Sequence, residues 1–597
     1  MDENNKNFIV ALVLSVLVFL VWNYFYIVPK QEKLKERQQA EALLKKQGQG
    51  ANPPKVDGKI QTGTPITPGV VQAPVRIKSR GDILSDASKR VAIDTPAISG
   101  SINLVGGRVD DVLLKNFRQK VDKNSPPVEF FSPEGTKHPY FADFGWVSSD
   151  SSVVAPKNDT LWTKVSGDRL SVGSPVKLQF DNGKGLLFER EISIDDRFMF
   201  TITQRVMNKG SKALDLSPYG LIYRRNKPIS ESIFISHEGV VGVFNDELIE
   251  TTYSDLADDK LEKHSGKTGW VALTDKYWAA ALIPDTRHKF SSNFLGNAPE
   301  GSDDNYTVNY LLAGQIIEPG KTIEVTNRLY AGAKQGELIE TYADTLKINK
   351  FTNLIDWGWF HFITKPMFKS LVYFNHLVGN FGLAILIVTV IIKLLLFPLA
   401  NKSYKSMAYM KKMQPEMEKI RTRYKDDKMK QQQELMELYK KNKINPLSGC
   451  WPVLIQIPIF FALYKVLYVT IEMRHAPFVG WIQDLSAPDP TSLFNLFGLI
   501  PIDLPQFLMI GIWPLIMGIT MFIQMKLNPA PTDAVQAQIF TYMPIIFTFI
   551  LAGFSSGLVI YWAWNNTLSV IQQYYIMRRH GVEVNLLENM GFKKKSS

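Results

Sequence analysis

Hydrophobic and polar positions divide the chain into three parts. Residues 8–28 form a run of 21 residues without a charge, which is long enough to cross a bilayer as a helix. The next part, up to about residue 350, has no such run, and its shorter apolar segments predict β-strands. Long apolar segments then return at about 377–399, 451–471, 507–525, 535–554 and 557–577. The pattern predicts a multi-domain membrane protein with an α-helical bundle of six transmembrane spans, in which a large β domain follows the first span.

The first apolar run admits two interpretations, an uncleaved anchor or a cleaved signal peptide. Its leader, MDENNKN, carries Lys6 against Asp2 and Glu3, and no small-x-small cleavage site follows the run. These features favour a transmembrane anchor over residues 1–29. Residues 30–81 begin as a charged, helix-prone segment and become rich in Pro and Gly, which predicts a tether.

Residues 82–346 are expected to form an all-β domain. Phe198–Val206 has the composition of a strand and ends at an Asn-Lys-Gly turn. Tyr306–Leu312 and Thr322–Leu329 flank a Pro319-Gly320 turn, which predicts a hairpin. Many short strands over such a length predict a large sandwich.

Lys393 is the most informative residue of the membrane part, residues 347–580. It lies inside the apolar segment 381–397, where a lysine costs roughly 2.5–3.5 kcal/mol on insertion scales. Thr389 lies one turn earlier on the same helical face. The later spans contain no Asp or Glu that could pair with Lys393. Two interpretations remain: the lysine faces a wet cavity that opens inwards, which we favour, or it extends to the inner interface.

Other polar side chains in the third and sixth predicted spans extend this picture. A single polar side chain in a span often forms only an interhelical hydrogen bond, worth about 0.6 kcal/mol on average. As a set around one lysine, they predict a hydrophilic groove. Ile385 is expected to face lipid, and Lys465 to extend to the outer interface. The expected groove residues are Lys393, Thr389, Gln456, Tyr561, Trp562 and Asn565.

Residues 401–445 are expected to form a helical hairpin on the inner side. Apolar residues from Met407 to Tyr424 recur every three or four positions, and Asp426-Asp427 interrupts the pattern. We interpret the stripe first as the seam of the hairpin, and second as an adaptable Met-rich surface for apolar segments. The basic side chains are expected to attract ribosomal RNA or lipid. The candidate contact residues are Met407, Met410, Met417, Lys411 and Lys412.

Residues 349–369 are expected to form an amphipathic helix at the outer headgroups. Ile355, Trp359, Phe362 and Ile363 share a helical face, which favours an interfacial position. An ordinary aromatic belt at a helix end explains the residues equally well and predicts the same location.

Charge indicates the orientation of the predicted spans. Residues 401–445 carry 13 basic and 6 acidic groups, and the tail after residue 580 is basic, whereas 472–505 carries Arg474 alone against four acidic residues. The hairpin and both termini, including the tail 581–597, are therefore expected inside, and the β domain outside. Basic residues at 30–37 would lie on the predicted outer side, which disagrees with this orientation. The charge bias of the later loops is stronger, and the predicted orientation follows it. The net charge of +11 suggests an anionic partner.

Enzymatic functions fit the sequence poorly. Gly553-Phe-Ser-Ser-Gly557 matches a nucleophile-elbow pattern but lies between two predicted spans, and the last four spans contain no His. His237-Glu238 begins a zinc-protease-like string, but position 241 is Val. With Cys450 as the single cysteine, neither a Cys-based zinc site nor an internal disulfide is possible. We expect no metal and no cofactor, and keep a passive channel or transporter with a β receptor domain as the alternative function.

Several motifs resemble the signature of the YidC membrane protein insertases. The longest is the segment NPLSGCWPVLIQIPIFFALY at 445–464. Together the motifs cover about 350–580, and the large β domain behind a first anchor resembles the Gram-negative form of the family. The other motifs are Gln414-Pro-Glu416, Arg474-His-Ala-Pro477, Trp481-Ile-Gln-Asp-Leu-Ser486, Tyr542-Met-Pro-Ile-Ile-Phe547, Ser556-Gly-Leu-Val-Ile-Tyr561 and Gln572-Gln573.

The resemblance implies a five-helix core around a groove that is open to cytoplasm and lipid but closed outside. It also implies a periplasmic β-supersandwich like that of sugar mutarotases. The expected function is a membrane protein insertase and chaperone of the bacterial inner membrane, acting alone or with the Sec translocon and without nucleotide hydrolysis. Expected partners are nascent membrane proteins, Sec components, the ribosome and lipids, but not DNA. The family usually carries Arg at the position of Lys393, so bidentate Arg geometry is absent here.

Overall fold

The computed structural model describes residues 77–228, 236–259, 261–297, 304–442, 451–498, 500, 508–528 and 534–582. Several features expected from the sequence lie outside these residues: the anchor at 1–29, nearly all of the tether, Cys450 and the basic residues of the tail after 582.

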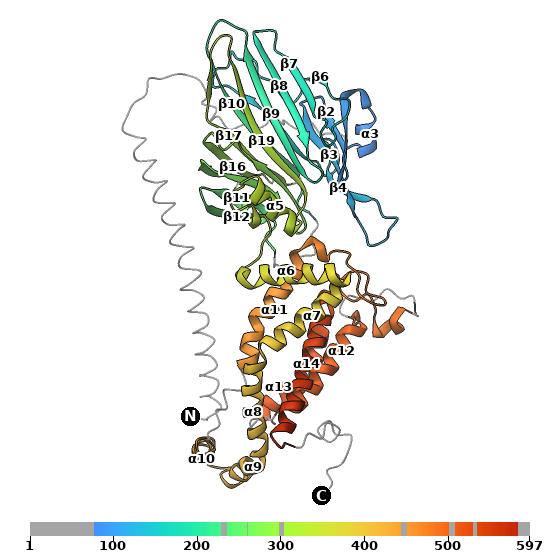
Figure 1. Ribbon diagram of the computed structural model, residues 1–597, viewed down its shortest axis with the longest axis vertical. Coiled ribbons are helices and arrows are strands. Elements are labelled where there is room, and N and C mark those ends of the chain that lie inside the picture. Colours follow the sequence, from blue (N-terminus) through green and yellow to red (C-terminus); the bar gives the residue numbers. More distant parts are fainter. Residues whose placement is uncertain are drawn as a thin grey trace, which may run out of the picture. The chain divides into compact units, whose positions relative to one another are not determined.

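The β domain is a sandwich of two antiparallel sheets, as the sequence predicts (Figure 1). Its first sheet has the order β1-β2-β3-β5-β10-β17-β16-β13, with β4 beside β3 and β18 beside β10. The bounds are β1 Arg90–Asp94, β2 Ile98–Asn103, β3 Arg108–Arg118, β4 Pro127–Phe131, β5 Tyr140–Val147, β10 Leu214–Arg225, β13 Leu261–Gly266, β16 Phe290–Asn297, β17 Asn305–Leu312 and β18 Gln315–Ile317.

The second sheet has the order β12-β11-β14-β15-β19-β9-β8-β7-β6. Every second residue of β8 is buried, because successive side chains of a strand point to opposite faces. The bounds are β6 Thr163–Ser166, β7 Val176–Asp181, β8 Leu186–Ile194, β9 Met199–Asn208, β11 Gly239–Phe244, β12 Glu247–Thr252, β14 Gly269–Thr274, β15 Trp278–Ile283 and β19 Thr322–Ala333.

The predicted hairpin around Pro319-Gly320 is wrong. Thr322–Ala333 (β19) pairs with β15 and β9 in the second sheet, whereas Asn305–Leu312 (β17) pairs with β10 and β16 in the first. The connection between them contains Gln315–Ile317 (β18), which adds to β10 before the chain changes sheet. A turn motif between two strands indicates a reversal of direction, but it does not indicate which sheet receives the second strand.

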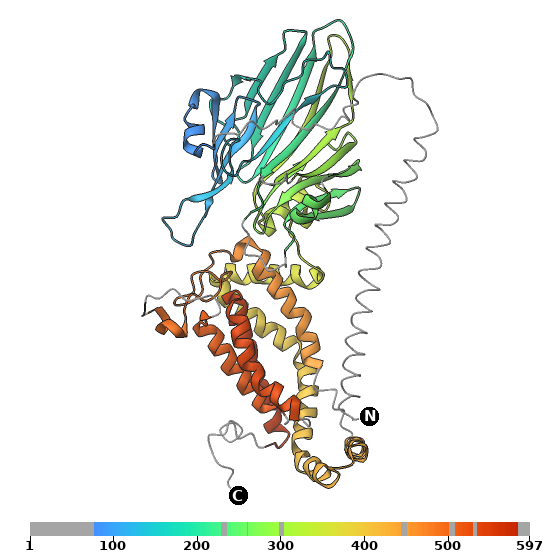
Figure 2. The same cartoon turned by 180° about the vertical axis from the view of Figure 1, so that it is seen from behind.

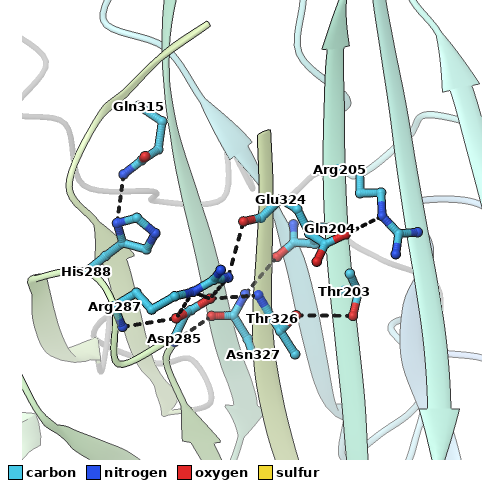
Figure 3. A network of polar contacts seen from close by, with 10 residues as sticks. All are labelled: Thr203, Gln204, Arg205, Asp285, Arg287, His288, Gln315, Glu324, Thr326 and Asn327. Atoms are coloured by element: carbon cyan, nitrogen blue, oxygen red, sulfur yellow. Dashed lines mark hydrogen bonds and ion pairs between the residues drawn. The ribbon is translucent and has the colours of Figure 1, made fainter. Parts of the chain in front are cut away.

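Polar side chains connect the strands of the second sheet where β9 and β19 lie side by side (Figure 3). The buried Asn327 donates to Gln204 across the two strands, at 3.2 Å. Asp285, which follows β15, accepts from the backbone N–H of Thr326 at 3.0 Å and pairs with Arg287. These bonds satisfy polar groups that would otherwise be buried without a partner.

The helical part follows the sandwich and is visible from both sides in Figures 1 and 2. Helices occupy the places of the five predicted later spans, at α7, α11, α12, α13 and α14. The bounds are α5 Gly336–Thr345, η3 Phe351–Leu354, α6 His361–Val378, α7 Phe381–Leu395, α8 Phe397–Lys412, α9 Gln414–Arg423, α10 Lys428–Lys441, α11 Trp451–Val469, η5 Ile471–Met473, η6 Leu493–Gly498, α12 Ile512–Leu527, α13 Ala534–Ala552 and α14 Ser556–Arg579; the short α3 Arg80–Leu84, η2 Ala87–Lys89 and α4 Tyr253–Asp259 belong to the β domain.

Among the described residues, no individual helix combines the length and the apolar composition needed to cross a membrane. Helices α7 and α8 meet that requirement only together, and the pair is bent by 68°.

Two predicted elements have different bounds. The expected amphipathic helix at 349–369 is instead η3, a connection and α6, so Ile355 and Trp359 precede α6 and do not share its face with Phe362. The break at Asp426-Asp427 is present, because Asp427 caps the N-terminus of α10. The first arm of the hairpin is divided at Met413 into α8 and α9, with Pro415 in the first turn of α9. Proline is favoured in the first turn of a helix and disfavoured in its interior, which accounts for the division.

Candidate functional site

Lys393 lies in the last turn of α7, whose side chains are otherwise almost all apolar. Its ammonium donates to the hydroxyl of Ser569 on α14 at 2.7 Å. Ser569 in turn donates to the carbonyl of Asn565, four residues earlier, at 2.8 Å. No carboxylate of the described residues lies within ion-pair distance of Lys393. The lysine is therefore held by one neutral hydroxyl group, and its positive charge is not neutralised.

A second polar contact lies on the same face of α14. Gln456 of α11 donates to the hydroxyl of Tyr561. Tyr561, Asn565 and Ser569 are spaced four residues apart, so they line one face of the helix. At 1.5 Å of rise per residue, Tyr561 and Ser569 are separated by about 12 Å along the helix axis. This face of α14 therefore carries a polar row that connects α11 at one end with α7 at the other.

Four of the six expected groove residues thus belong to this row or bind to it: Lys393, Gln456, Tyr561 and Asn565. Thr389 is buried, and its hydroxyl donates to the carbonyl of Ile385 within α7 at 2.6 Å. Trp562 points elsewhere, because it packs between Phe460 and Phe547, with ring centroids at 4.8 and 5.8 Å. Within the described part of the chain, the hydrogen bond of Lys393 goes to Ser569 and not to Thr389 or Trp562.

One expectation about a side chain of the helical part is wrong. Ile385 is only 1% exposed and packs in the core, whereas Leu394, beside Lys393, is 64% exposed. Lys465 forms an ion pair with Asp356 at 2.7 Å, and its extension to the outer interface stays a prediction. Asp356 precedes α6 in the sequence and lies outside the predicted spans.

Further residues near the polar row were not among those expected from the sequence. Ser569 is the hydrogen-bond partner of Lys393, and the buried Tyr404 of α8 lies near Ser569. Ser403 of α8 and Gln573 of α14 each bury an oxygen without a hydrogen-bond partner in the part of the chain that is described. The spacing of four residues from Tyr561 through Asn565 to Ser569 was the signal that could have identified Ser569.

The methionines of the hairpin have different surroundings. Met407 packs against buried residues of α14, including Ile576 and Met577. Met417 is buried and accepts a weak hydrogen bond from Tyr439 of α10 at 3.9 Å, as expected for the seam between the two arms. Met410 is half-buried, and Lys412 is exposed.

Lys411, a candidate contact residue of the hairpin, does not present its charge at the surface. Its ammonium nitrogen is buried without a hydrogen-bond partner among the described residues.

The chain is similar to known proteins over nearly its full length. Residues 90–370 match the family model described as the YidC periplasmic domain, and residues 373–583 match the model of the 60Kd inner membrane protein. A protein of Methylobacterium radiotolerans described as membrane protein insertase YidC is 52% identical over 99% of this chain and 97% of its own length. The protein of the same description from Rhizobium meliloti is 49% identical over 99% of both chains.

A solved structure described as an active YidC insertase with its first transmembrane domain resolved is 18% identical, with a TM-score of 0.35, over 82% of this chain and 92% of that one. The two family models together cover nearly all of the chain from the first strand to the end of α14, and identity of about half extends over the full length of the relatives. The chain therefore belongs to the YidC family of membrane protein insertases.

Proposed function

We propose that this inner-membrane insertase receives the hydrophilic end of a client protein at the polar row of α14, next to Lys393. The observation that carries the proposal is the ammonium of Lys393, which is bound to the Ser569 hydroxyl and to no carboxylate of the described residues. An acidic residue of a client supplies the missing negative charge. The apolar client segment then enters the lipid, which releases about 0.8 kcal/mol for each buried CH₂ group, so no nucleotide is needed.

The exposed apolar surface of the helices supports a lipid environment for this site. On α13, large apolar side chains recur at three- and four-residue spacing and are more than half exposed. Such a surface is costly in water and favourable in hydrocarbon. These side chains are Tyr542, Ile545, Ile546, Phe549 and Ile550.

The proposal includes an orientation and a set of partners. The hairpin α8–α10 lies in the cytoplasm, where its exposed basic residues, among them Lys412, and the basic tail attract the ribosome or anionic lipid, whereas the ammonium of Lys411 is buried. The β domain, assigned to 82–346, lies in the periplasm, and α6 lies at the outer headgroups at the start of the core, 347–580. Nascent membrane proteins are the clients, and Sec components act beside the chain on some of them.

Charge reversal at position 393 tests the proposed role of the lysine. Lys393→Glu should strongly reduce insertion of a single-span client with an acidic translocated end, because two negative charges then meet in a medium of low dielectric constant. Lys393→Arg should retain most of the activity, since it preserves the charge. The measurement is protease protection of the client after reconstitution of the full chain in vesicles. Equal insertion by the Glu and Arg variants would contradict the proposal.

Photo-crosslinking tests the path of the client. A crosslinker at Thr389, Tyr561 or Trp562 should capture a stalled nascent span, and one at the exposed Leu394 should capture mainly lipid. Leu394 is the control because its side chain is 64% exposed on the outer surface of the helices. Nascent-chain adducts that are as frequent at Leu394 as at Tyr561 would exclude this path.

A further inference from the structure

A pocket of about 400 Å³ lies between α5, η3 and the first half of α6. All the residues that line it fall within 336–369, so one continuous segment builds it. The volume is within the range of roughly 300–1,000 Å³ typical of sites for small molecules. Its wall is mainly apolar and includes Ile339, Ile355, Trp357 and Phe368.

Several contacts hold the wall in place. Gly336 begins α5 so close to α6 that a Cβ atom at this position would lie 2.5 Å from the ring of Phe368. The backbone N–H of Gly336 donates to the carboxylate of Glu472 at 2.8 Å. The indole N–H of Trp357 donates to the carbonyl of Thr352 at 3.1 Å. The pocket is therefore a built feature of this junction.

Charged groups surround the apolar wall. Lys365 and Lys369 lie one turn apart on α6, and both line the pocket. Lys369 pairs with Glu340 of α5 at 2.7 Å, and the ammonium of Lys365 lies 3.4 Å from the hydroxyl of Thr352. Two cations and one anion leave a net charge of +1 at the pocket.

The solvent face of α6 is also apolar. Phe362, Tyr373 and Leu377 are 65, 60 and 64% exposed, and they lie along one side of the helix together with the exposed side chain of Lys369. An exposed apolar stripe that contains a lysine is typical of a helix lying in a membrane interface. The pocket therefore opens beside the surface that would contact lipid.

We propose that this pocket binds a membrane phospholipid, with the acyl chain against the apolar wall and the phosphodiester at Lys365 and Lys369. The inference rests on the proposed position of α6 at the outer headgroups. The net charge of +1 matches the single negative charge of a phosphodiester. An apolar peptide fits less well, because its backbone N–H and C=O groups would lose hydrogen bonds against an apolar wall, whereas an acyl chain has no such groups.

Photoactivatable lipid tests the proposal on the full chain in vesicles. Phosphatidylglycerol with a diazirine on its acyl chain should form adducts with pocket residues such as Ile339 and Trp357, and with the stripe at Tyr373. The double variant Lys365→Gln/Lys369→Gln should lower the pocket adducts by about fivefold for each lysine removed. The adducts at Tyr373 should fall much less, because the apolar side chains of the stripe remain. The control Lys347→Gln removes an exposed lysine that does not line the pocket. Phosphatidylcholine with the same diazirine should label the pocket less, because its headgroup has no net charge.

The outcomes separate this inference from the proposal on which it rests. Adducts at the stripe without adducts in the pocket overturn the pocket site alone. Absence of adducts from both overturns the interfacial position of α6 as well. Pocket adducts that persist at full yield in the double variant overturn the role of the lysines. A photoreactive nascent client is used as a second probe. If the client labels the pocket and the lipid does not, the choice of a phospholipid as the ligand is overturned. Client insertion by the Lys393 variants is measured in a separate assay. None of these labelling results therefore decides the proposed role of Lys393.

Discussion

At the scale of the residue, one hydroxyl group decides how the lone cation of α7 is held. Ser569 accepts from Lys393 and donates to the backbone of α14. A lysine without a carboxylate partner has several rotamers of similar energy, and the Ser569 contact selects one of them. Ser569 is therefore a positioning residue, and its effect should differ from that of the lysine itself.

Ser569→Ala should reduce insertion of clients with acidic ends by about threefold, because hydrogen bonds between membrane helices average about 0.6 kcal/mol. Ser569→Thr should restore most of the loss, since it restores the hydroxyl. The measurement is the same vesicle insertion assay. The matched control is Thr567→Ala, which removes a hydroxyl with the same backbone bond on the same helix but no contact with Lys393. An equal effect of the two Ala variants would indicate loss of helix packing instead.

Glu472 gives a prediction of pH dependence. Burial raises the pKa of this carboxyl to about 7, and its second oxygen has no partner among the described residues. A raised carboxyl pKa means that the folded state retains a proton that the unfolded state releases above about pH 4.3. Stability is therefore lost as the pH rises from about 4.3 through 7. A buried unpaired acceptor costs about 1–3 kcal/mol, and a charged one costs more.

Glu472→Gln should remove this dependence, because the amide does not ionise and its oxygen can still accept from Gly336. We expect the difference in Tm between pH 5 and pH 8, measured on the detergent-solubilised full chain, to become smaller than in the parent protein. Glu318→Gln, at an exposed glutamate of the β domain, should leave the difference unchanged. A parent protein whose Tm does not fall between pH 5 and pH 8 would contradict the assignment.

At the scale of the element, close approach of helices depends on small residues. Gly518 of α12 faces α13, where a Cβ atom would lie 2.1 Å from the hydroxyl oxygen of Thr548. Thr548 is itself bound to the carbonyl of Pro544 at 2.8 Å, so its hydroxyl cannot move away without losing that bond. Small residues at helix contacts in membranes allow such packing.

Gly518→Ala should destabilise the α12–α13 contact by about 1–3 kcal/mol, the typical cost of overpacking. A second substitution, Thr548→Ala, should recover much of the loss because it removes the clashing oxygen. Gly553→Ala is the control, since nothing lies within 4 Å of a Cβ atom there. Thermal unfolding of the four proteins in detergent provides the measurement. Destabilisation by Gly553→Ala of the same size would show that the effect is not packing.

At the scale of the whole molecule, the orientation across the membrane is the main prediction. Charge bias places the hairpin inside and the β domain outside. On a Cys450→Ser background, Asp122→Cys and Gln483→Cys should react with an impermeant maleimide added to spheroplasts, because both positions are exposed and expected outside. Asp426→Cys, which is exposed on the hairpin, should react only after permeabilisation. Labelling of Asp426→Cys on intact spheroplasts would reverse the predicted orientation.

The distribution of apolar residues along the chain predicted the local strands and helices. Phe198–Val206 corresponds to β9, and the later apolar segments correspond to α7, α11, α12, α13 and α14. The two-sheet class of the β domain also followed from its many short strands. These features were predictable because the period of a pattern reports which face of a local element is buried. Lys393 was identifiable for a similar reason, since one charge in an apolar segment contrasts with its neighbours.

Only the tertiary structure determined which distant residues and strands of the chain contact one another. The connection between β17 and β19 changes sheet, Lys465 pairs with Asp356 from another segment, and Ser569 holds Lys393 across 176 positions of sequence. The apolar pocket under α5 likewise exists only because Gly336 lets that helix approach Phe368. A sequence pattern reports the preference of each residue for burial or exposure. The identity of its neighbour depends on which distant surfaces pack together, and that choice minimises the free energy of the whole fold and not of any single segment.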